Sequence, residues 1–110
     1  MMYNVPKGKR LTDIPKLYDT ENIQLRDKII HLHFFIGGCD WYIAEFNGKD
    51  IMWGYCILNG DYQNSEWGYI SFDELKSIKI SGVQVDCEFK KYFPPQKASK
   101  VKEIARGNGY

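Results

Sequence analysis

The sequence predicts a small α+β fold: a mostly antiparallel β-sheet, arranged as a meander, with short helices. Two Asn-Gly pairs, which adopt the positive φ of tight hairpin turns at low cost, separate three apolar, aromatic segments. These segments are residues 41–46, 51–58 and 66–71. A capping box, Ser71-x-x-Glu74, predicts a helix that begins after the third segment. Strict alternation of apolar and polar residues over 83–89 predicts a further strand.

Before the meander, the sequence predicts one helical turn and one strand. Thr12 or Asp13 can cap a short helix within residues 11–20, with Pro15 in its first turn. Residues 29–36 alternate as a strand with two different faces, and we expect 30–36 to lie in the sheet. One face holds Ile30, Leu32, Phe34 and Ile36, and the other holds Ile29, His31, His33 and Phe35.

The hairpin register predicts which side chains share each face of the sheet. The side of Phe34 and Ile36 should also hold Trp41, Ile43 and Cys56. The side of His33 should hold Tyr42, Ala44, Phe46, Trp53 and Tyr55. Both faces are largely apolar, so we expect one of them to be covered by a helix or to await a partner.

The last elements follow from the same patterns. The capped helix should run from Ser71 to about Ser77. In the strand 83–89, the inward residues are Val83, Val85, Cys87 and Phe89. After Pro94-Pro95, residues 99–106 can form a basic amphipathic turn or two, ended by Gly107.

Charge divides the chain into three parts. Residues 11–89 form one domain with 6 basic and 13 acidic side chains, a net charge of −7. A basic N-terminal arm (1–10) and a basic C-terminal tail (90–110) carry +3 and +5. The acidic charge of the body has two interpretations. It can be an ordinary solvated surface, or a surface that docks on a basic groove or imitates nucleic acid. No apolar stretch is long enough to cross a membrane and no secretory signal opens the chain, so we expect a cytoplasmic protein of the host cell.

Zinc is the one cofactor that the sequence suggests. Cys39, Cys56 and Cys87 are an odd number without a close pair, which argues against disulfides and for reduced thiols. The predicted register brings them toward one end of the sheet, and His31 or His33 could complete a tetrahedral zinc site. The alternative is packing, because free cysteine is often buried and two strand histidines at i and i+2 are common.

No catalytic constellation emerges from the sequence, and we expect a protein that is not an enzyme. Several acids could pair, but nothing in the sequence forces two of them together in an apolar pocket. They are Asp40, Glu45, Glu66, Glu74, Asp86 and Glu88. The aromatic residues lie in an acidic, lysine-poor region, which favours core packing over base stacking.

Several segments within residues 11–89 resemble a family of unknown function found in plasmids, integrative elements and phages. The most distinctive motif is EWGY-x-S-x-x-EL at 66–75. The other matching segments are IPKLYDTE (14–21), FF (34–35), WYIAE (41–45), WGY (53–55) and VDCEF (85–89). The resemblance implies a protein of a mobile genetic element and transfers no chemistry. His33 and the three cysteines depart from the family pattern, so a metal site would belong to this chain alone.

The chain is also similar to small phage anti-defence inhibitors, among them the anti-CRISPR proteins that bind Cas nucleases. That similarity implies a non-enzymatic inhibitor that occludes a host defence complex, with a Cas9-type nuclease as the partner. We expect acids and aromatics of the body to contact it, namely Asp40, Glu45, Trp53, Tyr55, Glu66 and Trp67. The alternative is a nucleic-acid-associated accessory protein of plasmid or phage maintenance that uses its basic ends on phosphate. A small metal-dependent hydrolase ranks third.

Overall fold

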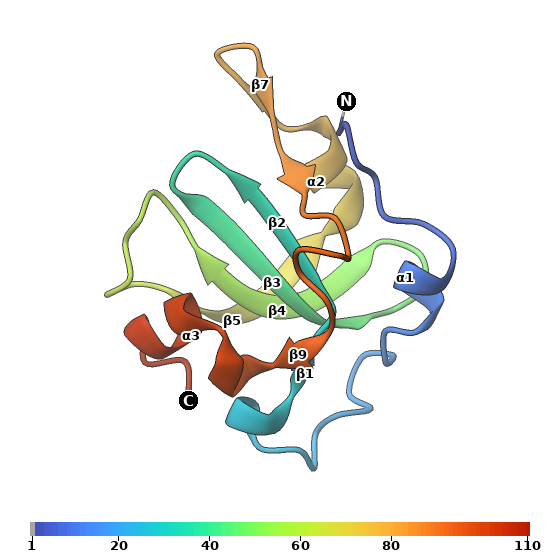
Figure 1. The fold of residues 1–110 in the computed structure, drawn as a ribbon, viewed down its shortest axis with the longest axis vertical. Helices are drawn as coiled ribbons and strands as arrows, with labels where there is room; N and C mark the ends of the chain where they lie inside the picture. Colours follow the sequence, from blue (N-terminus) through green and yellow to red (C-terminus); the bar gives the residue numbers. More distant parts are fainter. Residues whose placement is uncertain (1) are drawn as a thin grey trace.

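A five-stranded antiparallel sheet forms the centre of the molecule, in the order β5-β4-β3-β2-β8 (Figure 1). The computed structural model describes residues 2–110. The five strands are β2 (Leu32–Ile36), β3 (Cys39–Phe46), β4 (Ile51–Ile57), β5 (Glu66–Ser71) and β8 (Asp86–Cys87). The predicted α+β class and the antiparallel meander are confirmed.

Short helices and two small ladders surround this sheet. The helices are α1 (Lys9–Thr12), α2 (Phe72–Ser77) and α3 (Lys102–Arg106), with 3-10 turns η1 (Leu25–Asp27) and η2 (Ala98–Lys100). One ladder joins β1 (Ile29–Ile30) to β9 (Gln96–Lys97), and the other joins β6 (Lys79–Ile80) to β7 (Val83–Gln84). Within residues 2–110, none of the helices has the length and apolar character needed to cross a membrane.

The turn and capping signals behave as predicted. Gly48 (φ 86°) and Gly60 (φ 67°) adopt positive φ in the two hairpin connections. The Ser71 hydroxyl oxygen accepts a hydrogen bond from the main-chain N–H of Glu74 at 3.1 Å, and α2 ends at Ser77. The local sequence therefore determines both where the strands turn and where the helix begins.

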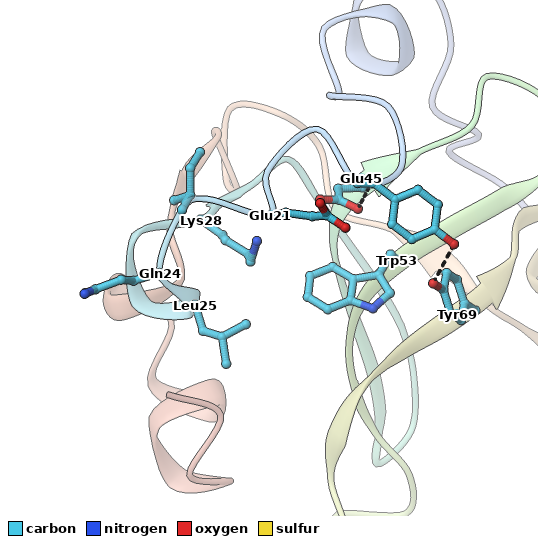
Figure 2. Close-up of a pocket in the computed structure, with 9 residues that line it drawn as sticks. Glu21, Gln24, Leu25, Lys28, Glu45, Trp53 and Tyr69 are labelled. Atoms are coloured by element: carbon cyan, nitrogen blue, oxygen red, sulfur yellow. Dashed lines mark hydrogen bonds between the residues drawn. The ribbon is translucent and has the colours of Figure 1, made fainter.

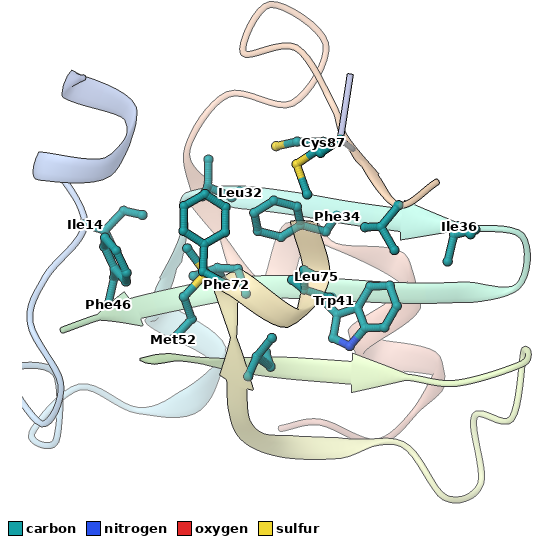
Figure 3. Close-up of a cluster of buried hydrophobic side chains, with 14 residues drawn as sticks. Ile14, Leu32, Phe34, Ile36, Trp41, Phe46, Met52, Phe72, Leu75 and Cys87 are labelled. Atoms are coloured by element: carbon teal, nitrogen blue, oxygen red, sulfur yellow. The ribbon is translucent and has the colours of Figure 1, made fainter. Parts of the chain in front are cut away.

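Each face of the sheet carries its own hydrophobic cluster. The α2 cluster lies on the face covered by α2 and the N-terminal segment (Figure 3). Its buried residues are Met2, Ile14, Leu32, Phe34, Ile36, Trp41, Ile43, Phe46, Met52, Ile70, Phe72, Leu75, Val85 and Cys87. The C-terminal cluster lies on the opposite face. Its buried residues are Ile30, Tyr42, Ala44, Tyr55, Ile57, Phe93, Ala98, Val101 and Ile104.

Both ends of the chain belong to the packed fold. Met2 is buried in the α2 cluster, and Phe93, Val101 and Ile104 are buried in the C-terminal cluster. The segments expected as a basic arm and a basic tail therefore cover the two apolar faces of the sheet. Their lysines and arginines had suggested a solvated surface, whereas the few apolar residues between them pack in the interior.

The predicted helical turn within residues 11–20 is wrong. α1 instead ends at Thr12. Beyond it, the main-chain N–H groups of Tyr18 and Thr20 donate to the carboxylate of Glu45, at 2.9 and 3.2 Å. These long-range bonds take the donors that a helix would use, and no local signal in the sequence announces them.

The strand predicted over 30–36 is broken at His31. Ile30 is fully buried in the C-terminal cluster, whereas Leu32 is fully buried in the α2 cluster. The chain crosses from one face to the other at His31 because β1 leaves the main sheet to pair with β9.

Phe46 lies on the face opposite to the one predicted. A β-bulge shifts the register of β3 against β4 between Ile43 and Glu45. The extra residue turns Phe46 into the α2 cluster, away from His33, while Tyr42 and Ala44 keep their predicted side. The other predicted neighbours, Trp41 and Ile43 included, are confirmed.

The alternation over 83–89 holds only in its middle. Val85 and Cys87 are buried, as predicted. Val83 and Phe89 are more than half exposed, because β7 turns away to pair with β6 and the chain leaves the sheet after β8.

Candidate functional site

A hollow of the surface lies between the loop 18–28 and strands β3, β4 and β5 (Figure 2). We call it the loop pocket, and its volume is about 560 Å³, within the usual size of a ligand pocket. It is lined by Tyr18, Glu21, Ile23, Gln24, Leu25, Lys28, Glu45, Trp53 and Tyr69.

The bulge in β3 positions the back wall of the loop pocket. It pairs Glu45, a residue only 5% exposed, with Trp53 of β4 and places the Glu45 carboxylate against the loop. That carboxylate accepts the main-chain N–H groups of Tyr18 and Thr20 and the Thr20 hydroxyl. A buried acid therefore holds the loop in place through three hydrogen bonds.

Lys28 completes the buried polar wall. The residue is also 5% exposed, and its ammonium donates to the Thr20 carbonyl at 2.5 Å and to the Thr20 hydroxyl at 2.8 Å. The same ammonium lies 5.3 Å from the centre of the Trp53 ring, a cation–π contact. Through Thr20, the charge of Lys28 is compensated by Glu45. The polar wall is thereby neutral and rigid.

The rim of the loop pocket is aromatic and exposed. Tyr18 and Tyr69 are 59% and 60% exposed, and their hydroxyls lie 3.0 Å apart. Tyr18 holds a positive φ of 72°, a conformation that costs a non-glycine residue about 1–3 kcal/mol and that the bonds to Glu45 maintain. Glu21 is an exposed acid at this rim, without an ion pair among residues 2–110.

A second polar cluster surrounds His33. Its Nε2 lies 2.7 Å from Asp40 and its Nδ1 lies 2.5 Å from Glu88. Burial by itself lowers the pKa of His33, but the hydrogen bonds and charges of the two carboxylates outweigh it and raise that pKa above 6.5. Both ring nitrogens are engaged, so neither is free to act as a base or to ligate a metal.

His31, the other histidine predicted as a metal ligand, lies in different surroundings. It lines a small hollow with Lys9, Arg10 and Lys90, where the two basic segments of the chain meet. Burial lowers the pKa of His31, and the nearby Asp13 only partly offsets it. The two histidines therefore do not converge on one metal ion.

The three cysteines do not form the predicted zinc site either. Burial raises the pKa of Cys56 to about 12 and that of Cys87 to about 11, which favours the thiol over the thiolate that zinc requires. Cys39 contacts Asn59 through its Sγ. Across residues 2–110, no group of three His, Cys, Asp or Glu side chains is arranged to hold a metal ion.

The structure separates the aromatics and acids predicted to contact a partner. Glu45 and Trp53 line the loop pocket, and Glu66 is exposed. Tyr55 is 1% exposed, and its hydroxyl donates to a main-chain carbonyl of the C-terminal turn at 2.9 Å. The Trp67 indole N–H donates to the Gly109 carbonyl at 2.7 Å. Tyr55 and Trp67 therefore hold the chain end, while Asp40 is held by His33.

Sequence reasoning missed most of the residues that shape the loop pocket. Glu21, Leu25 and Lys28 lie in the polar segment 21–28, for which the sequence predicts no helix or strand, and Tyr18 lies within the predicted helical turn. Tyr69 lies in the aromatic region for which the sequence favours core packing. No periodic pattern announced the site, because Thr20, Lys28 and Glu45 are polar residues that become buried only when they come together in the fold. Comparison with family models, curated proteins and solved structures gave no match.

Proposed function

We propose that this chain is a non-enzymatic binding protein that acts by occupying the surface of a protein partner, with the loop pocket as its contact site. The observation that carries the proposal is the exposed aromatic rim, Tyr18 and Tyr69, on a wall already fixed by Glu45 and Lys28. Interfaces concentrate their binding energy in such aromatic anchors around a preorganised hollow.

Charge favours a basic partner. Glu21 is an acid at the rim of the loop pocket without an ion pair among residues 2–110, and the body to which it belongs, residues 11–89, carries a net −7 beside the basic chain ends. An acidic rim speeds encounter with a basic groove, and this acceleration falls as salt rises. The resemblance to mobile-element and anti-CRISPR proteins makes a host Cas9-type nuclease the first partner to test.

The test is target-DNA cleavage by the nuclease at increasing ratios of this protein. We expect inhibition to be complete near one equivalent, and Tyr69→Ala or Glu21→Lys to weaken it about 30-fold or more, which corresponds to the lower bound of an interface hot spot. Tyr92→Ala is the matched control, because Tyr92 is 67% exposed outside the loop pocket. Inhibition well below one equivalent indicates turnover and contradicts the proposal.

A second candidate is nucleic-acid association through the basic ends. Lys9 and Arg10 of the N-terminal segment meet Lys90 of the C-terminal segment around His31. Capture from host lysate before and after nuclease treatment separates the two functions. If Lys9→Gln with Lys90→Gln abolishes capture and Glu21→Lys leaves it intact, phosphate binding replaces the proposal above.

A further inference from the structure

The two edges of the main sheet differ in how they are protected. At one edge, β8 has two residues, and the side chain and main chain of Asn4 bond to Cys87 and Asp86 there. At the other edge, β5 has six residues and, among residues 2–110, pairs only with β4. Long edge strands usually carry a lysine, a proline or a bulge, and β5 has none of these.

The hydrogen-bond pattern shows which groups of β5 face outward. Phe72 N–H donates to the Asp50 carbonyl at 2.9 Å, continuing the β4–β5 ladder beyond its last pair. Because antiparallel bonding alternates along a strand, residues at even positions of β5 bond to β4, and Trp67 and Tyr69 direct their N–H and C=O away from it. Within residues 2–110, these four main-chain groups have no hydrogen-bond partner outside the sheet ladder.

Neither face of β5 is covered at its centre. Tyr69 is 60% exposed on one face, and a Cβ added at Gly68 on the other face meets no atom within 4 Å. The outward main-chain groups of Trp67 and Tyr69 offer two donors and two acceptors at strand spacing.

The same edge leads into the loop pocket. Glu45 of β3 pairs with Trp53 of β4, and Trp53 pairs with Tyr69 of β5, so the three side chains form one row across the sheet. A residue opposite Tyr69 on an added strand continues this row, about 5 Å further on. Its side chain stands at the rim of the loop pocket, beside Tyr69 and on the same face of the sheet.

We propose that a protein partner binds as an extended segment that adds to the open edge of β5 and places a lysine or arginine side chain in the loop pocket. This inference rests on the proposed function and specifies its mode of recognition. Main-chain bonds to Trp67 and Tyr69 supply affinity, and the pocket supplies specificity.

The charges of the loop pocket favour a basic side chain. Lys28 is compensated by Glu45 through Thr20, so Glu21 is the acid left for a ligand. The aliphatic stem of a lysine or arginine can pack on Leu25 and Trp53 while its head reaches Glu21. A second copy of this chain, whose net charge is only +1, would bring no comparable excess of basic side chains to Glu21.

The test uses a five-residue probe, acetyl-Thr-Val-Arg-Val-Thr-amide, titrated into the full chain and followed by amide NMR. When the arginine lies opposite Tyr69, its main-chain N–H donates to the Tyr69 carbonyl and its carbonyl accepts from the Tyr69 N–H. We expect the amide protons of Trp67 and Tyr69 to become protected from exchange and the Trp53 indole signal to shift. Methylating the arginine main-chain nitrogen should weaken binding about tenfold, the value of one lost hydrogen bond.

Methylation of a flanking valine is the matched control, because its N–H points away from β5, and it should leave affinity unchanged. A glutamate in place of the arginine should also weaken binding about tenfold. On the protein side, Tyr69→Pro should lose more affinity than Tyr69→Ala, because only the proline removes the outward N–H. Thermal melting of both variants confirms that they remain folded.

Three outcomes overturn the inference. If the probe shifts Trp53 but arginine N-methylation has no effect, the pocket binds side chains without strand addition, and the proposed function stands. If the probe changes neither Trp53 nor the β5 amides, the edge is not a docking site for basic segments. If the amides of Trp67 and Tyr69 become protected with rising protein concentration alone, the occupant is a second copy.

Discussion

The two hydrophobic clusters on either side of the sheet are built by different means. The α2 cluster is apolar throughout, apart from the indole N–H of Trp41 and the thiol of Cys87. The C-terminal cluster contains two buried tyrosines, each with its hydroxyl bonded to the C-terminal segment. Shape complementarity holds the first cluster together, whereas the second also depends on polar bonds to one chain end.

This difference explains how far each face could be predicted. Leu32, Phe34 and Ile36 alternate, and the capping box at Ser71 announces the helix that covers them. On the other face, the covering residues Val101 and Ile104 stand among lysines and arginines, so composition suggested a solvated tail. Local patterns predict a face whose partner elements carry their own signals, and they fail where the cover is short and irregular.

The largest effect is expected from breaking the α2 cluster. Phe34 is fully buried and packs against Phe72 with ring centres 5.9 Å apart. Phe34→Ala should lower the free energy of unfolding by about 3–5 kcal/mol, through lost burial and the cavity left behind. Urea denaturation measures it. Phe35→Ala is the matched control: its ring is 36% exposed, and a loss as large as that of Phe34→Ala would contradict this picture of the cluster.

A smaller effect should come from removing one polar atom of the C-terminal cluster. Tyr55→Phe deletes a hydroxyl that donates to the Gly107 carbonyl at 2.9 Å and contacts Ser65 at 2.5 Å. It should lower the free energy of unfolding by about 1–2 kcal/mol, because a half-buried carbonyl loses its donor. Limited proteolysis should then cut the C-terminal turn sooner. Tyr3→Phe, at a tyrosine 91% exposed, should change neither result.

The loop pocket shows why a site can escape sequence analysis altogether. Its position depends on Glu45, which the bulge in β3 turns toward the loop. The bulge lies opposite Gly54, where an added Cβ would stand 2.0 Å from the Tyr42 carbonyl oxygen. A glycine inside a strand indicates that another backbone approaches closely, but nothing in the sequence predicts which loop the resulting bulge will contact. The strands could be predicted, and the irregularity that builds the site could not.

The smallest effect concerns pH and again separates the two faces. The His33 ring stacks on Tyr42 of the C-terminal cluster with centres 4.4 Å apart, between Asp40 and Glu88. Its pKa is raised in the folded protein, so the stabilisation from protonated His33 is complete below pH 6.5. It is lost as pH rises through the raised pKa. The pKa of His31 is lowered, so its contribution has the opposite sign and is lost as pH falls below 6.5.

Urea denaturation between pH 5 and pH 8, below the range in which cysteine thiols ionise, tests this prediction on three proteins. In His31→Gln, only the His33 contribution remains, so the free energy of unfolding should decline with rising pH above 6.5. In His33→Gln that decline should disappear, and in Glu88→Gln it should shrink, because one of the two carboxylates that raise the pKa is neutral. Protection of the C-terminal amides should follow the same pH dependence, since Phe93 also contacts the His33 ring at 5.5 Å. A decline that persists unchanged in His33→Gln would assign the pH dependence to other groups and leave the two faces alike in this respect.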